Sequence, residues 1–535
     1  MRLLFHTARH LKPIQITNRI ARRLSQPRLW AREFSPLKPV NRKWQNVEIM
    51  PCSILNADTV RFLNETGALR EWQNPEKSHL WLYNLHYFDD LHAENAVHRA
   101  TLHSELIVHW LHDNSPTVGV GWEPYPLSLR IVNWLKWLLV GNKPVPGMLE
   151  SLFQQAHVLS QQIEYHLQGN HLLANAKALV FAGCCFEGEL AKAWLNKGLS
   201  LLDEQHREQL LPDGAHFELS PMYHSIILMD ILDVIQLGQC FCGGKLGRMS
   251  ATLCDRAATM ANWLAGMLHP DGEISFFNDA AFGIAPRPQA ILDYAHRLGV
   301  TWPVTAAFAQ HYDASGYVAV RRHHQVALLD VAAIGPDYIP GHAHADSLSF
   351  EWSLHGQRVL VNSGTSEYGV SNERLRQRGT AAHNTVVVNS ENSSEVWSGF
   401  RVARRARPFG VQLLQEGDCT IVTASHSGYH RLRPKVTHSR EWQVSQGCLQ
   451  VKDTLDGRFD KAEAHFHFHP SVGLTRYKNL IIATLADGQR CEVFIDGGSA
   501  RIDDSTWHPE FGRSLASKQL VVVFEGATVE TSFRY

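Results

Sequence analysis

The sequence predicts a multidomain α+β protein, in which an incomplete α/α toroid is followed by a C-terminal antiparallel β-sandwich. From about Ala96 to Leu298 apolar residues recur with the helical period almost throughout. From about Gly316 onward the period becomes two, which is typical of strands with one buried face. A chain of 535 residues is too long for one ordinary core, so the two patterns indicate separate units. We expect a basic arm and linker over residues 1–75, the toroid over 76–310 and the sandwich over 311–535.

The N-terminal arm is basic, and its first acidic residue is Glu33. His6, Arg9 and His10 interrupt the apolar core that an export signal needs, so no signal peptide is readable. A solvated arm is the favoured interpretation, and peripheral contact with an anionic membrane or a partner is the alternative. Residues 31–75 contain several prolines and are expected to be irregular, wrapping or linking the rest. No stretch approaches the ~20 apolar residues of a membrane span.

Helices and strands are separated by Gly, Pro, Asn and Asp turn signals. Such a series of helices forms antiparallel hairpins, whose inner ends open into a cleft in a toroid. The expected helices span residues 96–113, 127–141, 148–167, 171–186, 189–210, 221–238, 248–268 and 288–298. The clearest strand patterns lie at residues 317–320, 358–361, 385–388, 448–451, 480–483 and 521–524.

Composition excludes some classes of protein. The formal net charge of -1 argues against a general nucleic-acid binder, so an anionic ligand would have to be bound by local charge. Nine cysteines form an odd set without regular spacing, which indicates reduced thiols and not a disulfide framework. Cys240 and Cys242 lack the second pair that a zinc knuckle needs. Fifteen Trp and thirty-one His suit sugar stacking and proton transfer, and they equally suit an ordinary core.

Histidines gather in the β half, in Gly341-His342-Ala343-His344 and at His383. His342 and His344 share one face if the segment is extended, and the alternation that continues through Trp352 predicts a strand starting here. Imidazoles that share one face beside a loop are typical of a catalytic or binding site. Local hydrogen bonding of these histidines is the alternative.

Polar residues at two helix starts complete the candidate set. Asn170 and His171 begin one helix, although Asn170 also suits a simple capping role. Tyr223 and His224 follow Pro221 in the first turn of another, and adjacent side chains on a helix diverge by ~100°, so at most one points into a given cleft. An amide, imidazoles and a phenol without a carboxylate pair disfavour glycoside hydrolysis. They fit β-elimination at a uronic acid, with donors on the enolate and a phenol of lowered pKa moving the proton.

These motifs, in this order and spacing, resemble the heparinase II/III-like polysaccharide lyases, a family with relatives that act on alginate oligomers. The resemblance covers most of the chain, and it implies an α/α toroid followed by an antiparallel β-sandwich. The matching motifs are Trp81-Leu82-Tyr83-Asn84-Leu85-His86-Tyr87, Trp122-Glu123-Pro124-Tyr125-Pro126-Leu127-Ser128-Leu129-Arg130, Gly169-Asn170-His171, Ser220-Pro221-Met222-Tyr223-His224, Gly341-His342-Ala343-His344-Ala345-Asp346 and Ala382-His383-Asn384-Thr385.

The resemblance also implies roles for catalytic residues. Asn170 and His171 resemble the pair that neutralises the substrate carboxylate, and Tyr223 resembles the tyrosine that acts as acid and, in some members, base. His342 resembles a histidine that serves as second base or neutraliser. Trp81, His86, Trp122, Tyr125 and Arg130 are candidates to line the cleft and bind the sugar, with a core role as the alternative for the aromatic residues.

His344 and His383 resemble two ligands of a zinc ion in the β half. The third ligand in relatives is an aspartate, whereas this chain has Asn362 in the turn Val361-Asn362-Ser363-Gly364. An amide oxygen is neutral and binds zinc more weakly than a carboxylate, so we expect a weak or empty site.

The function expected from these residues is a lyase that cleaves an acidic, uronate-containing polysaccharide. A catalytically silent glycan-binding or assembly protein of a capsule or exopolysaccharide pathway is the alternative. A glycosidase using Asp213, Glu218 or Asp279 is a third hypothesis. The family resemblance favours the periplasm or cell envelope, and the absence of a readable signal favours the cytoplasm. Expected partners are the acidic polysaccharide and not nucleic acid.

Overall fold

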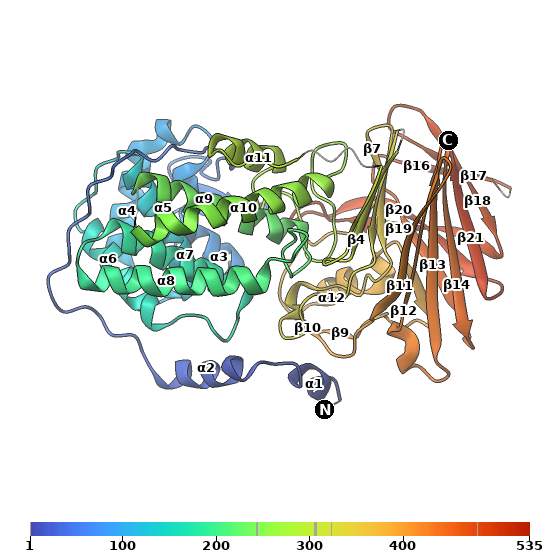
Figure 1. Ribbon diagram of the computed structural model, residues 1–535, viewed down its shortest axis with the longest axis horizontal. Coiled ribbons are helices and arrows are strands. Elements are labelled where there is room, and N and C mark those ends of the chain that lie inside the picture. Colours follow the sequence, from blue (N-terminus) through green and yellow to red (C-terminus); the bar gives the residue numbers. More distant parts are fainter. Residues whose placement is uncertain (1, 242–243, 304–307, 323, 479) are drawn as a thin grey trace.

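The protein has a helical half and a β half that lie side by side in the computed structural model (Figure 1). The structure describes residues 2–241, 244–303, 308–322, 324–478 and 480–535, so Cys242 of the Cys240–Cys242 pair lies outside the described residues. Helices dominate the chain up to Arg297 and antiparallel sheets dominate after it, which confirms the predicted fold class.

The helical half is built around a buried helix, α7 (Gly169–Cys185), of which every residue except His171 is buried. Helices α5 and α9 pack against α7, and α8 runs back along it as an antiparallel hairpin. Apolar residues at helical spacing put the inner faces of these helices into one core. The surrounding helices are α3 (His79–Tyr87), α4 (Ala100–Asp113), α5 (Pro124–Leu139), α6 (Met148–Gln161), α8 (Gly188–Gln209), α9 (Pro221–Cys240), α10 (Gly244–Gly266) and α11 (Pro288–Arg297).

Among the described residues, the β half contains antiparallel sheets of five, eight and four strands, and a two-stranded ribbon of β9 (Val396–Trp397) and β10 (Arg401–Val402). Their facing side chains form a second core, to which strands of alternating burial such as β13 contribute every other residue. The five-stranded sheet comprises β3 (Ala309–Tyr312), β4 (Tyr317–Arg322), β5 (Gln325–Asp330), β6 (Phe350–Leu354) and β7 (Gln357–Leu360). The eight-stranded sheet comprises β11 (Pro408–Glu416), β12 (Cys419–His426), β13 (Val436–Ser445), β14 (Cys448–Gly457), β16 (Gly473–Tyr477), β17 (Leu480–Thr484), β18 (Arg490–Asp496) and β21 (Thr528–Arg534). The four-stranded sheet comprises β8 (Val386–Val388), β15 (Ala462–His467), β19 (Gly498–Trp507) and β20 (Leu515–Phe524).

The segment that carries His342 and His344 is not the start of a strand, contrary to the sequence-based expectation. It begins with a 3₁₀ turn, η4 (Pro340–His342), and strand β6 starts only at Phe350. The backbone N–H of His344 donates to Asn278 Oδ1 at 3.0 Å and that of Ala345 to the Arg378 carbonyl at 2.9 Å. Because these donors bond to loop atoms, the segment cannot join a sheet ladder here.

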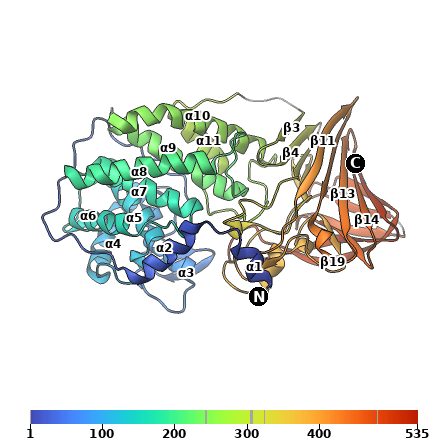
Figure 2. The ribbon, with the colours of Figure 1, turned by 60° about the horizontal axis from the view of Figure 1, so that its bottom comes forward.

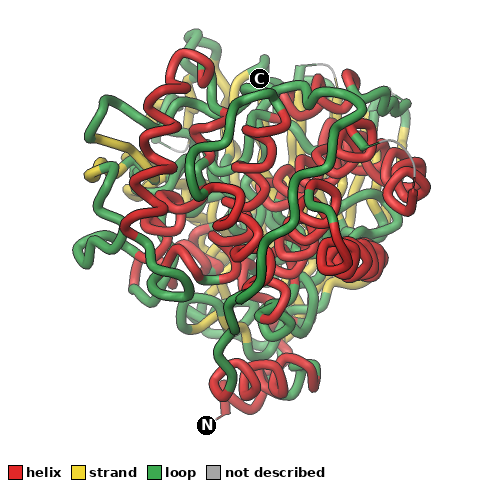
Figure 3. The backbone as a smooth tube through the Cα atoms, turned by 90° about the vertical axis from the view of Figure 1, so that its left-hand side faces the viewer, coloured by secondary structure: helices red, strands yellow, loops and turns green. Residues whose placement is uncertain are grey.

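The N-terminal arm and the linker are more ordered than the sequence predicts. The arm forms two helices, α1 (Arg2–Ala8) and α2 (Pro13–Leu24), and the linker contains a hairpin of β1 (Thr59–Phe62) and β2 (Glu65–Ala68). Between them the chain runs up the outside of the helical half (Figures 1 and 3). It bonds there to the ends of two inner helices, through Lys38 N–H to the Cys185 carbonyl at 2.7 Å and Asn41 N–H to the Cys240 carbonyl at 3.0 Å.

Within the part of the chain that the structure describes, no helix combines the length and the apolar character needed to cross a bilayer.

Candidate active site

A tyrosine from the helical half and a histidine from the β half meet where the two halves join. Tyr223 lies in the first turn of α9, which starts with Pro221 and is capped by Ser220, whose hydroxyl accepts the N–H of Tyr223 at 3.2 Å. Its ring packs on the imidazole of His342 with ring centroids 4.0 Å apart. Its hydroxyl lies 2.9 Å from the hydroxyl of Tyr368. A phenol and an imidazole are thus within reach of one substrate.

Burial dominates the ionisation of this phenol. It raises the pKa of Tyr223 well above the ordinary value, and the neighbouring Tyr368 adds to the effect. The expectation of a phenol with a lowered pKa is therefore wrong for the free protein. Tyr223 is a neutral proton donor at rest.

One buried carboxylate, Asp279, organises both histidines of the loop. Its Oδ2 lies 2.8 Å from His342 Nδ1, and its Oδ1 lies 2.8 Å from His344 Nε2. Arg374 donates to both oxygens of the same carboxylate. Burial alone would raise the pKa of Asp279, but Arg374 and the two imidazoles outweigh burial and hold it well below its usual value. The anion requires a proton on His342 Nδ1, which leaves Nε2 of that ring as the nitrogen that can accept one.

A second carboxylate, Glu218, lies on the other side of His342. Its Oε2 is 3.5 Å from His342 Nε2, and its carboxylate accepts the backbone N–H of Asn170 at the start of α7. Gly169 makes this approach possible, because its φ is +54° and a Cβ there would lie 2.5 Å from Glu218 Oε1. Burial raises the pKa of Glu218, an effect that His342 partly offsets.

Asn170 and His171 stand at the start of α7, with Asn170 buried and His171 partly exposed. Gln168 occupies the N-cap position of α7, and its side chain makes no capping hydrogen bond. Asn170 is the second residue of the helix and therefore does not cap it. His171 Nδ1 lies 3.3 Å from Glu164 Oε2. The His171 ring packs on Tyr125, the centroids being 4.3 Å apart. Tyr125, alone among the sequence-based sugar-binding candidates, thus contacts a candidate catalytic residue.

His224, next to Tyr223 on α9, points into the helical core. It is fully buried, with Nε2 3.0 Å from the Met260 carbonyl and Nδ1 accepting the His216 N–H at 3.3 Å. The two adjacent side chains therefore diverge, and Tyr223 is the one at the junction of the two halves.

The other proposed sugar-binding residues are core residues, so that expectation is corrected. Trp81 is fully buried, and its indole donates to the Glu65 carbonyl at 3.0 Å. Trp122 is 4% exposed, and its ring packs on that of the fully buried Trp110. Rings enclosed in this way cannot stack on a sugar.

His86 and Arg130 are likewise structural. The Arg130 guanidinium is fully buried, lies 3.9 Å from the ring centre of Trp110 and donates to the Gly121 carbonyl at 2.7 Å. His86 is fully buried, and its Nε2 lies 3.0 Å from the Trp72 carbonyl. Neither side chain is available to an acidic sugar.

The candidate zinc ligands form a weak donor set. His344 Nδ1 and His383 Nε2 lie 3.2 Å apart, close enough for one ring to donate a hydrogen bond to the other. Asn362 is fully buried, and its amide nitrogen has no hydrogen-bond partner among the described residues. The described residues contain no group of three His, Cys, Asp or Glu side chains placed to hold a metal ion. Two imidazoles and a neutral amide fit zinc poorly, since structural zinc sites carry four ligands and favour anionic ones.

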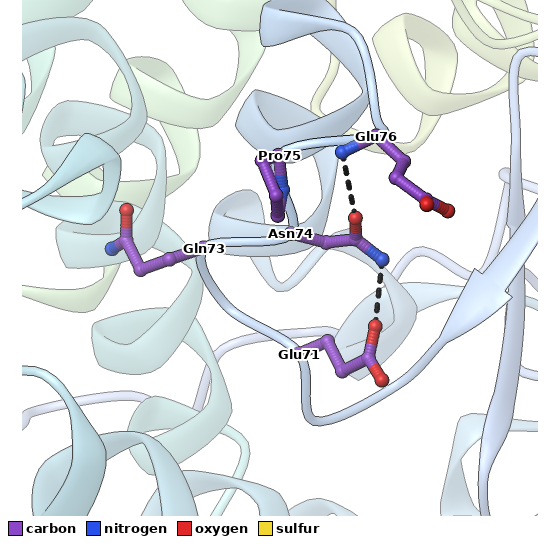
Figure 4. A pocket seen from close by; sticks show the side chains of 5 residues that line it. All are labelled: Glu71, Gln73, Asn74, Pro75 and Glu76. Carbon is purple, nitrogen blue, oxygen red and sulfur yellow. Dashed lines mark hydrogen bonds between the residues drawn. The ribbon is translucent and has the colours of Figure 1, made fainter.

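A surface hollow lies elsewhere, in the turn before α3, and is lined by Glu71, Gln73, Asn74, Pro75 and Glu76 (Figure 4). Asn74 braces this turn by donating to Glu71 at 2.6 Å and accepting the N–H of Glu76 at 2.8 Å. Two carboxylates in the lining would repel an acidic glycan. The hollow is therefore not the candidate site.

Two profiles of one protein family match this chain. The profile described as heparinase II/III N-terminus matches residues 145–289, and the profile described as heparinase II/III-like, C-terminal matches residues 306–535. A heparin-sulfate lyase from Bacteroides stercoris is 25% identical over 378 residues, which are 66% of this chain and 54% of that protein. A heparin-sulfate lyase from Pedobacter heparinus is 43% identical over 111 residues, which are 19% of this chain and 16% of that protein. The chain thus spans 54% or less of the length of these two relatives.

Solved structures share the fold. A crystal structure of heparinase III superimposes with a TM-score of 0.68 and 17% identity, covering 88% of this chain and 79% of that chain. A heparan sulfate lyase from Pedobacter heparinus superimposes with a TM-score of 0.59 and 18% identity, covering 98% of this chain and 87% of that chain. The order of a helical half and a β half is therefore common to these proteins.

Proposed function

Because this chain belongs to the heparinase II/III-like family, we propose that it is a polysaccharide lyase that cleaves a uronate-containing acidic polysaccharide by β-elimination. The observation that carries the proposal is the ring contact between Tyr223 and His342, which joins a proton donor of one half to a proton acceptor of the other. Tyr223 is buried, at 7% exposed, and the His342 side chain is 17% exposed, so His342 is the more open of the two at this junction.

The reaction needs one proton removed and one delivered. His342 Nε2 accepts the proton from C5 of the uronate, and the electrons of that C–H bond form the double bond between C4 and C5. The C4–O bond breaks, and the phenol of Tyr223 gives its proton to the leaving oxygen. Tyr223 suits the acid role because burial keeps it protonated. His342 suits the base role because Asp279 holds its Nδ1. The protein is reset when His342 loses its proton and Tyr223 regains one.

Removal of the C5 proton requires the charge on the uronate carboxylate to be neutralised. Asn170 and His171 are the residues proposed for this task, as donors to the carboxylate oxygens while the enolate forms. Both stand in the first turn of α7, where the helix dipole also favours negative charge. Tyr125, in ring contact with His171, offers an aromatic surface beside them.

The names of the relatives suggest which substrates to test first. Both curated relatives described above are named heparin-sulfate lyases, so heparan-type glycans are the first substrates to test, followed by alginate and uronate-containing capsular polymers. The test is ultraviolet absorbance of the purified protein with each glycan, since elimination creates an unsaturated uronate. A rise with at least one glycan, lost in Tyr223→Phe, supports the proposal. The absence of a rise with all of them contradicts it.

A glycan-binding protein without turnover is the second candidate function. The neutral amide of Asn362, where the family resemblance implies a carboxylate, favours it. Binding of an acidic glycan that Tyr223→Phe leaves unchanged, with no product, would support this candidate. The glycosidase hypothesis fits less well, because Asp279 is fully buried and bound by Arg374 and two imidazoles, so it cannot attack or protonate a sugar.

A further inference from the structure

The N-terminal helices α1 and α2 lie on the outside of the molecule and contact both halves (Figure 2). Thr7 of α1 donates to the Val402 carbonyl at 3.2 Å and accepts the indole N–H of Trp397 at 3.1 Å, which joins it to the β half. Lys12, which precedes α2, forms an ion pair with Glu208 of α8. The arm is therefore held on the protein by defined contacts.

The face of α2 that contacts the protein is polar. Gln15 is 5% exposed, and its amide donates to the Tyr338 carbonyl at 3.3 Å. Asn18 Oδ1 lies 3.1 Å from His166 Nδ1, and Arg22 lies 4.0 Å from the carboxylate of Glu164. Positions 15, 18 and 22 follow the helical spacing of three and four, so they form one stripe.

The opposite face of α2 is apolar and points to solvent. Ile16, Ile20 and Leu24 follow one another at intervals of four residues and are 50%, 55% and 83% exposed. A helix on a globular protein normally turns its apolar stripe to the core and its polar stripe to water. Helix α2 is inverted in this respect, and the part of the chain that the structure describes leaves half or more of each side chain in its apolar stripe open to solvent.

Helix α1 repeats this arrangement. Leu4 and Phe5 are 52% and 66% exposed, while His6 and Thr7 face the protein. Both helices of the arm thus present exposed apolar side chains. We call this set the arm face, and it consists of Leu3, Leu4, Phe5, Ile14, Ile16, Ile20 and Leu24.

The charged residues around the arm face indicate the kind of surface that it can bind. Exposed arginines flank it, with Arg2 and Arg9 at α1 and Arg19 and Arg23 one turn apart on α2. The first acidic residue of the chain is Glu33, beyond both helices. An apolar stripe bordered by arginines without acids is the pattern of a helix that lies in the plane of an anionic membrane surface.

We propose that the arm face docks this protein on an anionic lipid surface. Ile16, Ile20 and Leu24 enter the boundary between headgroups and acyl chains, and Arg19 and Arg23 bind lipid phosphates. The polar stripe of α2 keeps its contacts with the protein during docking. Arg22 on that stripe pairs with Glu164, which also contacts His171, so the docked helix lies one ion pair away from the candidate active site.

The test is co-sedimentation of the full chain with lipid vesicles. Binding is expected to vesicles of phosphatidylcholine mixed with phosphatidylglycerol and not to pure phosphatidylcholine, and added salt should weaken it because it screens the arginines. The triple variant Ile16→Gln/Ile20→Gln/Leu24→Gln should lower the affinity for mixed vesicles by more than about tenfold, as expected for the loss of buried apolar side chains. Arg19→Gln/Arg23→Gln should lower both the affinity and its dependence on salt.

The matched control is Leu55→Gln/Val97→Gln/Val118→Gln, which removes three exposed apolar side chains that do not belong to helices α1 and α2 and are 45%, 70% and 62% exposed. It should bind vesicles as the unchanged protein does, and all variants should keep its melting temperature. Equal binding by both triple variants, or no binding to mixed vesicles, overturns the proposal. A dimer in lipid-free light scattering that only the arm-face variant abolishes would also overturn it, by assigning the face to a second copy of the chain.

Discussion

The imidazole of His342 lies on the phenol ring of Tyr223, with their centroids 4.0 Å apart. One ring is held by the capped start of α9 and the other by a 3₁₀ turn of the β half. The contact therefore exists only when the two halves are correctly joined. It is the geometric basis for the proton transfers proposed here.

The variant Tyr223→Phe tests the acid. It keeps the ring and its packing on His342 but removes the proton carrier, so turnover should fall by roughly 10²–10⁴-fold, the usual contribution of general acid–base catalysis. The melting temperature should change little. Steady-state rates on the active glycan and a thermal melt are the measurements. Tyr368→Phe, which removes the hydroxyl 2.9 Å away, is the matched control and should cost much less. Equal losses in both variants would count against Tyr223 as the acid.

Replacement of Asp279 should affect stability as well as turnover. Asp279→Asn removes the negative charge of a fully buried carboxylate that contacts Arg374, His342 and His344. Breaking one partner of a buried ion pair costs about 3–5 kcal/mol, so the free energy of unfolding should fall by an amount of that order. Urea unfolding measures it.

The control for that variant is Asp271→Asn, because Asp271 also pairs with an arginine, Arg358, at 2.7 Å but has a side chain 37% exposed. A partly exposed pair contributes about 1 kcal/mol or less. Equal destabilisation by the two variants would show that the buried carboxylate of Asp279 stabilises the protein no more than the partly exposed carboxylate of Asp271.

Zinc binding should become stronger when the side-chain amide of Asn362 is replaced by a carboxylate. Asn362→Asp replaces a neutral oxygen with an anionic one at the position that the family resemblance assigns to the third zinc ligand, so the zinc content of the purified protein should rise. Elemental analysis measures it, with His383→Ala added to Asn362→Asp as the control that should remove the metal again. Stoichiometric zinc in the unchanged protein would contradict the weak site, and zinc in neither protein would contradict the site itself.

The β half should lose stability in acid through Asp453. Burial would raise the pKa of Asp453, but Arg440, its cross-strand partner, and His438 outweigh burial and lower it from 3.8 to about 2. A depressed pKa means that the unfolded chain binds the proton more readily, so the stabilisation is present above pH ~4 and is lost as pH falls towards ~2.

The variant Asp453→Asn should therefore be less stable than the unchanged protein at pH ~7, and the difference should shrink between pH ~4 and ~2. Urea midpoints across this range measure it. Asp456→Asn, which changes an exposed carboxylate on the same strand, is the control and should show no such trend. A difference that stays constant from neutral to acid would refute the assignment.

Much of the fold could be predicted from the sequence because the elements carry strong local signals. The expected helix at 189–210 is α8 (Gly188–Gln209), bounded by turn residues at both ends. The strand pattern at 448–451 lies within β14. The arm was harder to predict, since helices α1 and α2 turn polar residues to the protein, and a sequence does not say which face of an amphipathic helix is covered.

The sequence predicted those residues of the candidate site that lie next to a recognisable helix start. Ser220 and Pro221 mark a helix start, and this fixed Tyr223 in a first turn. Asp279 appears in a loop without periodicity, and its contacts to His342 and Arg374 come from segments far apart in the chain, so its role could not be read locally. Trp81 was misassigned because an aromatic residue has the same sequence signature in a core as in a sugar site.

The measurement that tests the central claim most directly is the mass of the products formed from a defined acidic oligosaccharide. Elimination adds nothing to the substrate, so the masses of the two fragments should sum to the mass of the substrate, with the unsaturation on the fragment that carries the new non-reducing end. Tyr223→Phe should give the same fragments far more slowly. Fragments whose summed mass exceeds that of the substrate by one water would show hydrolysis and contradict the lyase assignment.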